Sequence, residues 1–571
     1  MQLELGKINC YNYKKKNRGE NMKIAKKITA LALAFIIMLT ACDDKNSSSD
    51  LKTNEQTKAT YDLDYDFEDF DKDEESVDRT KTFTPYEKMS DGPKYEEAKF
   101  VDKSNNIEFE RIFKAEDLNI KADSKIITVD NEKVVQVGAN ATISVAVDIP
   151  QSGNYSVEFV WKTEQYTKPM VVFAGQKANP EVSPSDVFIT YGIYNVNVES
   201  EKLVARLTSV GHDKMQLKEI RIFSAQKISQ ETYNVSAELS NKNATDNTKR
   251  LMKFIADNYG KNVLTGQTSN NAMASQEFQK IYNTTGRYPA VCGFDLIEYS
   301  PSRKARGSYS NAVDNAIRWY QVENGIVEFA WHWNAPEKYL YDTGSDYTGE
   351  QKWWKGFYTE ATSISIKDIM EGRDEEGYQL LLDDIDAIAV QLKILQNYDV
   401  PVLWRPLHEA SGGWFWWGAE GAEPYKALWR LLYDRLTNYH KLNNLIWVYN
   451  GQNPAWYPGD DVVDIIGEDI YPEKKDVSPQ QSRFKQALSS TESKKIIALT
   501  ENGNIPDIDM LLEEKVMWSW FCTWEGDFVL DKKSDTVSTE YTPQDIVIKA
   551  YNHENTITLD ELPDLKTYSL D

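Results

Sequence analysis

Hydrophobic and polar residues alternate with a period of two between residues 95 and 225. The runs ATISVAVDIP, YSVEFVWKT, LVARLTSV and MQLKEIRIF show this alternation, and turn signals such as QSGN separate them. Because successive side chains of a strand point to opposite faces, such runs predict strands with one buried face. Repeated at short intervals, they predict an all-β, jelly-roll-like sandwich over residues 95–225.

The pattern changes after residue 245, where short apolar runs alternate with longer amphipathic segments. Apolar residues in one such segment recur at helical spacing, at Leu381, Ile385, Ile388, Leu392 and Leu395. Eight apolar runs begin near Asn262, Tyr288, Gly325, Pro401, Asn444, Val463, Lys495 and Trp518. Eight strands alternating with helices predict a (β/α)8 TIM barrel over residues 246–560, with a linker at 226–245 and a C-terminal tail at 561–571.

The residues before the sandwich have the pattern of a leader followed by a spacer. Met22 opens a lysine-rich stretch, and the apolar run ITALALAFIIMLTA ends at Cys42. A basic stretch before a short apolar run is typical of a secretory signal, and LTAC resembles a bacterial lipobox. We therefore expect a signal region at 1–42 with its true start at Met22, a lipid on Cys42, and a disordered acidic linker at 43–94. The protein is then expected at the bacterial cell surface or in the periplasm, anchored to the membrane.

The composition of the chain limits the kinds of partner and cofactor that we expect. The net charge of −24 over 571 residues argues against nucleic acid. Aromatic residues make up 12% of the chain, and their faces suit sugar stacking as well as core packing. Beyond the leader only Cys292 and Cys522 remain, which gives no disulfide framework and no paired metal ligands. The sequence has no GxSxG, GxxxxGK or HExxH motif, so we expect no cofactor, no metal and a monomer.

Two glutamates end apolar runs, Glu409 in PVLWRPLHE and Glu501 in KIIALTENG. These runs are the fourth and seventh strands of the predicted barrel, whose strand ends and following loops build the active site. Side chains from these two strands can converge over the barrel axis. Glycosidic cleavage needs such a pair, with carboxyl groups about 5–5.5 Å apart for retention of configuration and about 6.5–9.5 Å apart for inversion.

The segments RPLHE to GGWFWWG, TENG and EDIYP resemble glycoside hydrolase family 26. The resemblance implies that Glu409 is the general acid/base and Glu501 the nucleophile, with Tyr471 donating a hydrogen bond to the nucleophile. The alternative for Tyr471 is a tyrosine at the barrel rim without a role. Arg405 fits a position near the nucleophile, where its charge keeps Glu501 ionised, or it forms a buried structural ion pair.

The resemblance also implies contacts with substrate. His332 matches a family histidine that contacts the sugar next to the cleaved bond. His408 matches one that lines the glycone subsite, although strict alternation points His408 away from Glu409 unless the strand end turns both inward. Trp414 matches a tryptophan that stacks beside the acid/base. Trp417 belongs to an aromatic wall that can raise the pKa of Glu409 by desolvation.

The same resemblance sets the expected substrate. It implies a retaining β-mannanase, endo-acting on mannan, glucomannan or galactomannan. The family also contains β-1,3-xylanases and mixed-linkage β-glucanases, so these substrates remain open. A different class of answer is an inactive glycan-binding surface lipoprotein, against which the paired glutamates argue.

The sandwich resembles carbohydrate-binding modules of families 6 and 35 through FKAEDL, the PQSGNY turn and LKEIRIF. In such modules a glutamate like Glu116 binds structural calcium together with an aspartate near the last strand, where this chain has Lys218. The candidate sugar platforms, for which core packing is the alternative, are Trp161, Tyr166, Tyr191 and Tyr194.

Overall fold

The computed structural model describes residues 109–570 except 122, 130, 181, 183, 186–187, 210, 212–213, 225–227, 342–351 and 473. The expected signal region, the lipidation site at Cys42 and the acidic linker at 43–94 lie outside the described residues. Among the described residues, no helix is long and apolar enough to cross a membrane.

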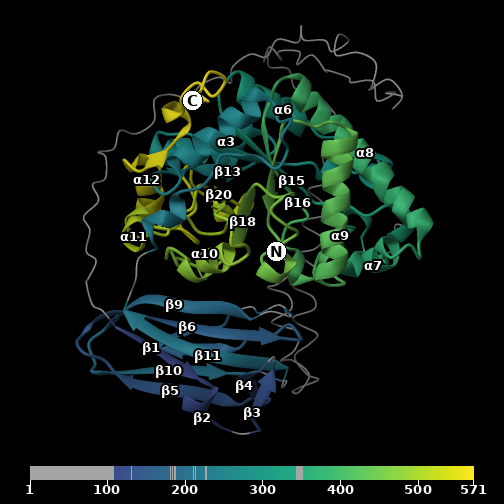
Figure 1. The fold of residues 1–571 in the computed structure, drawn as a ribbon. Helices are drawn as coiled ribbons and strands as arrows, with labels where there is room; N and C mark the ends of the chain where they lie inside the picture. The colour runs from purple at the N-terminus through teal and green to yellow at the C-terminus, as the bar shows by residue number, and fades with distance from the viewer. Residues whose placement is uncertain are drawn as a thin grey trace, which may run out of the picture. The chain divides into compact units, whose positions relative to one another are not determined.

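The first folded part is a sandwich of two antiparallel sheets (Figure 1). One sheet runs in the order β3-β4-β11-β6-β9 with β1 also paired to β11, and the other in the order β2-β5-β10-β7-β8. The strands are β1 Glu110–Lys114, β2 Asn119–Ile120, β3 Lys125–Val129, β4 Glu132–Val137, β5 Thr142–Asp148, β6 Gly153–Thr163, β7 Met170–Phe173, β8 Gln176–Ala178, β9 Ile189–Val198, β10 Lys202–Thr208 and β11 Met215–Ser224. Alternation holds as expected: in β10, Leu203, Ala205 and Leu207 are buried and the residues between them are exposed.

The sandwich core contains one of the four candidate sugar platforms, Trp161, and a second, Tyr191, packs against it. Trp161 is fully buried and stacks on Tyr191 at 5.6 Å between ring centroids. The hydroxyl of Tyr194 donates to Glu158 Oε1 at 2.8 Å. Core packing therefore accounts for Trp161, which cannot reach a sugar, whereas Tyr166 is 43% exposed.

The glutamate expected to bind calcium is paired with a lysine instead. Glu116 forms an ion pair with Lys133, and Lys218 forms one with Glu132. The ammonium groups already balance the charge that a calcium ion would neutralise. These residues do not fit a calcium site.

The second folded part is a closed barrel of eight parallel strands, as predicted (Figure 1). Its strands are β13 Gly266–Thr268, β14 Val291–Asp295, β15 Ile326–Trp331, β16 Val402–Pro406, β17 Leu445–Tyr449, β18 Ile465–Ile470, β19 Ile496–Asn502 and β20 Phe521–Thr523. Seven lie within the predicted apolar runs, whereas the first run, NVLTGQ, forms β12 and only its end enters the barrel strand β13. The strands are buried throughout except for Asp295, because helices cover the outside of the barrel and side chains fill its inside.

The helices are α3 Asp246–Asn258, α4 Gln276–Thr285, α5 Pro301–Lys304, α6 Ala312–Gln321, α7 Ile366–Met370, α8 Glu375–Asn397, α9 Ala422–Tyr433, α10 Gln481–Leu488, α11 Ile508–Glu514 and α12 Gln544–Asn552. A short strand pair, β12 Val263–Leu264 with β21 Thr556–Ile557, joins the two ends of this domain. In α8 the five apolar residues singled out by their spacing are all buried. Asp374 caps its first turn by accepting the Gly377 N–H at 2.9 Å.

The segments flanking the barrel pack against it. Ile228, Tyr233 and Leu239, in the expected linker, are buried in the barrel's hydrophobic core. In the expected tail, Leu565 is buried and the Tyr568 hydroxyl donates to Asp257 Oδ2 at 2.9 Å. The domain is therefore larger than the strand and helix pattern alone indicates.

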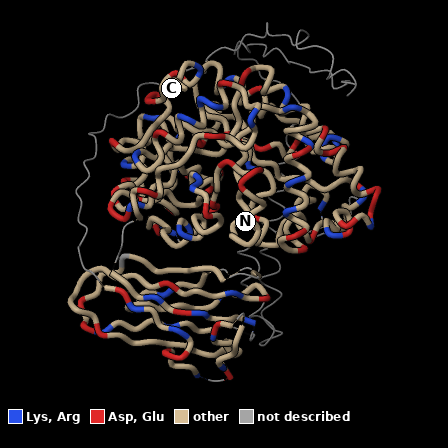
Figure 2. Tube along the Cα trace, viewed as in Figure 1, with Lys and Arg blue, Asp and Glu red and all other residues tan. Residues whose placement is uncertain are grey.

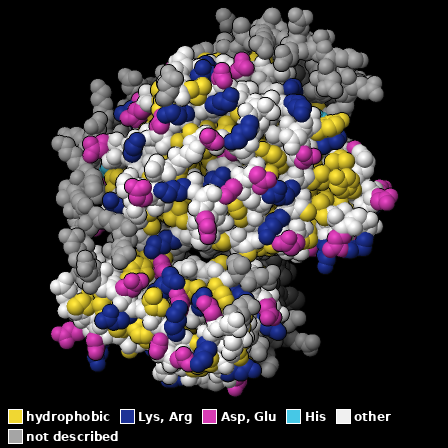
Figure 3. Space-filling view, viewed as in Figure 1, with side chains coloured by type: hydrophobic (Ala, Val, Ile, Leu, Met, Phe, Trp, Pro, Cys, Tyr) yellow, Lys and Arg dark blue, Asp and Glu magenta, His cyan; other side chains and the backbone are white. Residues whose placement is uncertain are grey.

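The described surface carries charges of both signs. Asp and Glu are interspersed with Lys and Arg along the chain (Figure 2), and the face in Figure 3 shows the same mixture with scattered apolar side chains.

Candidate active site

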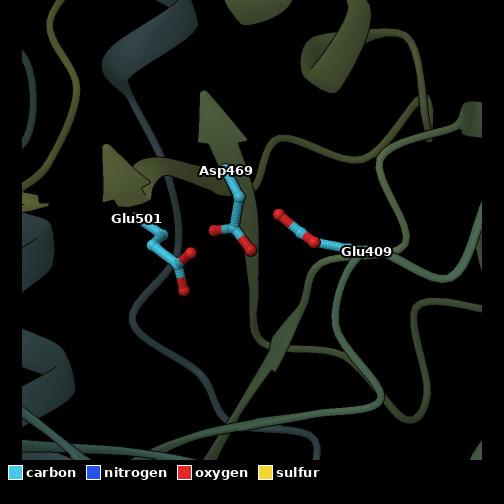
Figure 4. Close-up of side chains that lie close together, drawn as sticks. All are labelled: Glu409, Asp469 and Glu501. Carbon is cyan, nitrogen blue, oxygen red and sulfur yellow. The ribbon is translucent and has the colours of Figure 1, made fainter. Parts of the chain in front are cut away.

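Three carboxylates converge at the carboxyl-terminal mouth of the barrel (Figure 4). Glu501 lies in β19, Asp469 in β18, and Glu409 follows the end of β16. One carboxylate oxygen from each lies within 4.8 Å of those of the other two. Oxygens of the two predicted glutamates thus lie no more than 4.8 Å apart, a close approach that favours the retaining geometry of about 5–5.5 Å over the inverting one of about 6.5–9.5 Å.

An unusual backbone places Glu409. Leu407 and Glu409 have φ of 51° and 53°, so two left-handed residues flank His408 and break the strand alternation. The Glu409 N–H donates to the Asn450 carbonyl at 2.8 Å, which holds this turn. His408 and Glu409 therefore both turn toward the site, an outcome that alternation argued against.

The Arg405 guanidinium contacts three carboxylates of the site. This fully buried guanidinium donates to Glu328 Oε1 at 3.0 Å, to Asp469 Oδ2 at 2.7 Å and to Glu501 Oε2 at 2.9 Å. Burial opposes its charge, but these carboxylates hold the pKa of Arg405 well above its usual range. Arg405 was expected either to lie beside the nucleophile or to form a buried structural ion pair. It does both, because its buried ion pair with Glu501 is also its contact with the candidate nucleophile.

The single positive charge of Arg405 cannot neutralise all the carboxylates around it. Burial raises the pKa of Glu328 to about 7, and burial together with Glu501 and Glu409 raises that of Asp469 well above its usual range. The Asp469 carboxylate also accepts from Asn450 Nδ2 at 3.0 Å and Thr500 Oγ1 at 2.8 Å. Burial therefore disfavours the charged forms of Glu328 and Asp469, and the hydrogen bonds that they accept oppose this effect.

Glu409 has the properties of an acid that keeps its proton. Burial and the nearby Glu501 raise the pKa of Glu409 to about 7. Trp414 Nε1 donates to Glu409 Oε2 at 3.0 Å, which favours the ionised form and limits the rise. A general acid with a pKa near the working pH protonates a leaving group effectively.

Glu501 has the properties of a charged nucleophile. Its side chain is buried, and each oxygen has a donor: the Tyr471 hydroxyl at Oε1 and Arg405 at Oε2. Hydrogen bonds from a guanidinium and a phenol stabilise a carboxylate charge and fix its orientation. Burial and Glu501 raise the pKa of Tyr471 well above its usual range, so Tyr471 stays a donor.

His332 and His408 meet beside these carboxylates, with their Nε2 atoms 3.2 Å apart. The His332 ring also packs against Phe357, Phe415 and Trp524, with centroids 5.1, 5.6 and 6.0 Å away. Its side chain is 12% exposed at the mouth of the barrel. His332 is thus placed to contact a bound sugar.

Three of the predicted site residues are almost fully buried. Arg405, His408 and Trp417 are all 1% exposed or less, so none presents a surface to substrate. Trp417 instead donates from Nε1 to the His408 carbonyl at 2.8 Å. His332, Tyr471 and Trp414 keep exposed surface, Trp414 most of all at 37%.

Sequence analysis missed Asp469, Glu328 and Asn450. Each lies in a barrel strand or directly after one, where a polar residue within an apolar run is a signal for the site. Asp469 precedes Tyr471 by two positions in EDIYP, so strand periodicity places both on one face. That spacing was the available signal for Asp469.

The three converging carboxylates also have the spacing of a cation site. However, Arg405, Tyr471, Asn450 and Thr500 already donate to Glu501 and Asp469. A guanidinium bound to two of the three carboxylates repels a metal ion. The donor set fits proton transfer and nucleophilic attack better than metal binding.

Replacing Trp414 with Phe should move the basic limb of the pH profile of kcat/KM upward by roughly half to one pH unit. The variant keeps an aromatic ring but loses the indole N–H that favours ionised Glu409, so the pKa of Glu409 rises further. Glycoside hydrolysis measured between about pH 5 and 9 checks this. A lower kcat/KM with an unmoved limb would show that Trp414 acts on substrate alone.

Comparison with known proteins agrees with this geometry. Residues 240–561, more than half of the chain, match glycosyl hydrolase family 26. The chain is 42% identical over 330 residues to a mannan endo-1,4-beta-mannosidase of Thermothelomyces thermophilus, covering 58% of this chain and 64% of that relative. It is 33% identical over 448 residues to mannan endo-1,4-beta-mannosidase B of Piromyces sp., covering 75% and 72%.

A solved structure extends the similarity beyond the barrel. The Podospora anserina GH26-CBM35 β-(1,4)-mannanase superposes with a TM-score of 0.56 and 33% identity, covering 80% of this chain and 99% of that one. This share exceeds the barrel and includes the sandwich, which agrees with the resemblance to a carbohydrate-binding module. From the match across the barrel, the chain belongs to glycosyl hydrolase family 26.

Proposed function

We propose that this chain is a mannan endo-1,4-β-mannosidase that cleaves β-1,4-mannosidic bonds in mannan, glucomannan or galactomannan with retention of configuration. The observation that carries the chemistry is the close approach of Glu409 and Glu501, one with a raised pKa and the other held by two donors. The mannanase names of the relatives support the substrate, although the chain spans only 64% of the first of them.

In the first step, Glu409 gives its proton to the glycosidic oxygen while a Glu501 oxygen attacks the anomeric carbon. The bond to the leaving sugar breaks and its electron pair stays on the protonated oxygen. A covalent glycosyl–Glu501 ester remains, and Glu409 is left ionised. Arg405 and Tyr471 hold the nucleophile in place for this attack.

In the second step, ionised Glu409 takes a proton from water, whose oxygen attacks the same anomeric carbon. The ester bond breaks, Glu501 leaves as a carboxylate, and Glu409 is protonated again. Two inversions at one carbon give net retention. Because Glu409 must start protonated, kcat/KM is expected to fall above about pH 7.

The protein lacking residues 1–42 should release manno-oligosaccharides of mixed length from linear mannan and galactomannan. Glu501→Ala should lower kcat by at least about a thousandfold, because the covalent step is lost. Glu409→Ala should retain attack on an activated aryl β-mannoside far better than on mannan, because a good leaving group departs without a proton in the first step; the second step, which has lost its base, then limits turnover. Chromatographic product sizing measures the first outcome and initial rates measure the others.

The alternatives are separated by the same assay run on β-1,3-xylan and mixed-linkage β-glucan. Release from only one of these would keep the two-glutamate chemistry and overturn the substrate. Mannobiose as the sole product would overturn endo action. No product from any polysaccharide would favour a glycan-binding protein without activity.

We propose further that the enzyme is a lipoprotein anchored through Cys42 at the bacterial surface or in the periplasm. The lysine-rich stretch, the short apolar run and the LTAC segment support this. An acidic spacer between the lipid and the folded domains would leave the cleft free to meet a polysaccharide.

The full chain expressed in a bacterium should partition into the membrane fraction and incorporate radiolabelled palmitate. Cys42→Ser should lose the label, because no thiol remains to be acylated, and processing after Ala41 should stop. Cys292→Ser serves as the control, since that thiol is buried in the barrel. Equal labelling of the wild type and Cys42→Ser would contradict the proposal.

A further inference from the structure

Asp295 contacts both the ring and the backbone N–H of His332. It ends β14, and its Oδ2 lies 2.5 Å from His332 Nδ1 while its Oδ1 accepts the His332 backbone N–H at 3.2 Å. The carboxylate is itself fixed, because Oδ1 also accepts the Ile297 N–H at 2.8 Å. The Asp295 N–H donates to Asn270 Oδ1 at 2.8 Å. Neither the ring nor the carboxylate can turn without losing several hydrogen bonds.

The contact continues to a second ring. His332 Nε2 lies 3.2 Å from His408 Nε2, so one of the two nitrogens must donate and the other accept. Asp295 accepts the hydrogen bond from the Nδ1–H of His332, so in a neutral His332 the Nε2 atom carries no proton. Only a doubly protonated His332 can therefore donate to His408. A neutral His332 must instead accept from His408.

The surroundings of His408 decide between these two arrangements. His408 Nδ1 is buried with no hydrogen-bond partner among the described residues, and Phe415 and Trp417 pack against the ring at 5.2 and 5.7 Å. If His332 donates, this Nδ1 carries a proton, and the negative face of an aromatic ring tolerates an N–H. If His332 accepts, Nδ1 is a buried lone pair among aromatic rings, and a lone pair has no such favourable contact with a ring face.

We propose that Asp295 is a positioning residue that holds His332 as an imidazolium, and that this charged ring fixes the tautomer of His408 and sets a positive charge beside the catalytic glutamates. The effect on catalysis rests on the proposed function. The protonation state of His332 does not.

The charges around His332 support this state. The charged or titratable groups facing it are Asp295 from β14, Arg405 from β16, His408 and Glu409 after β16, Glu501 from β19 and Glu525 after β20. Burial lowers the pKa of His332, but Asp295 and then Glu501 outweigh burial and raise it. Burial, with His332 and Arg405, lowers the pKa of His408 well below its usual range.

The charge of His332 shifts the pKa of Glu409 in a definite direction. The positive charge of His332 lowers the pKa of Glu409, opposing burial and Glu501. In Asp295→Asn, His332 loses its counter-charge and becomes neutral near pH 7, so that this opposition disappears. The pKa of Glu409 then rises, and the basic limb of kcat/KM moves to higher pH.

The first test is a titration of the histidines in the full chain by ¹⁵N NMR with labelled histidine. The chain has only five histidines, and His332→Asn assigns the signal. In the wild type, His332 should keep both ring protons above pH 7 while His408 stays neutral, and in Asp295→Asn the His332 pKa should fall by about one unit or more. A wild-type His332 that titrates below 6.5 would overturn the proposal without any variant.

The second test is the pH profile on mannan. Asp295→Asn should move the basic limb upward by roughly half to one pH unit. Asp509→Asn is the matched control, because Asp509 Oδ1 on α11 lies 3.2 Å from Nε2 of His553, which follows α12, in an aspartate–histidine pair outside the active site. It should leave the limb in place. A lower kcat in Asp295→Asn with an unmoved limb and an unchanged His332 signal would reduce Asp295 to a structural role.

The two tests separate failure of this inference from failure of the proposed function. The NMR titration needs no substrate, so it decides the state of His332 even if mannan is not cleaved. Should Asp295→Asn not fold, the wild-type titration still decides it.

Discussion

The geometry of the active site depends on the ion pairs of Arg405. One buried guanidinium binds Glu328, Asp469 and Glu501, which lie on three different strands of the barrel. Removing one partner from a buried ion-pair network leaves uncompensated charge and costs about 3–5 kcal/mol. The same contacts that close the inside of the barrel therefore orient the nucleophile. Burial in the same cluster raises the pKa values of Glu328, Asp469 and Glu409.

The environments of the two glutamates differ, which lets identical side chains take different roles. Glu409 sits on a left-handed turn after its strand, receives only the Trp414 indole and faces Glu501. Glu501 lies within its strand and receives a guanidinium and a phenol. Burial pushes the first toward its neutral form, whereas the donors favour charge on the second. The acid and the nucleophile are thus assigned by their surroundings.

Part of the fold and part of the active site were predictable from the sequence, and the reason is physical. Strand periodicity and strand ends are local, so the eight strands, Glu409 and Glu501 could be placed from the pattern, and EDIYP placed Tyr471 at the mouth. Contacts between strands are not local: the pairing of Asp295 with His332, 37 positions away, leaves no periodic signal. In the run Trp414 to Trp417, a tight turn exposes Trp414 and buries Trp417, and composition alone cannot distinguish them. Apolar residues in the expected linker and tail pack on the barrel because they cover its surface, which a pattern search for strands does not detect.

The central claim is that Glu409 and Glu501 act together in a double displacement. The most direct measurement is ¹H NMR of the anomeric protons during hydrolysis of a β-1,4-manno-oligosaccharide, with enough enzyme to outrun mutarotation. The separation of the two carboxylates predicts that the first product formed is the β-anomer, which then relaxes to the α/β mixture. A first product with α configuration would mean that water attacks directly, and it would contradict the assignment of Glu501 as the nucleophile.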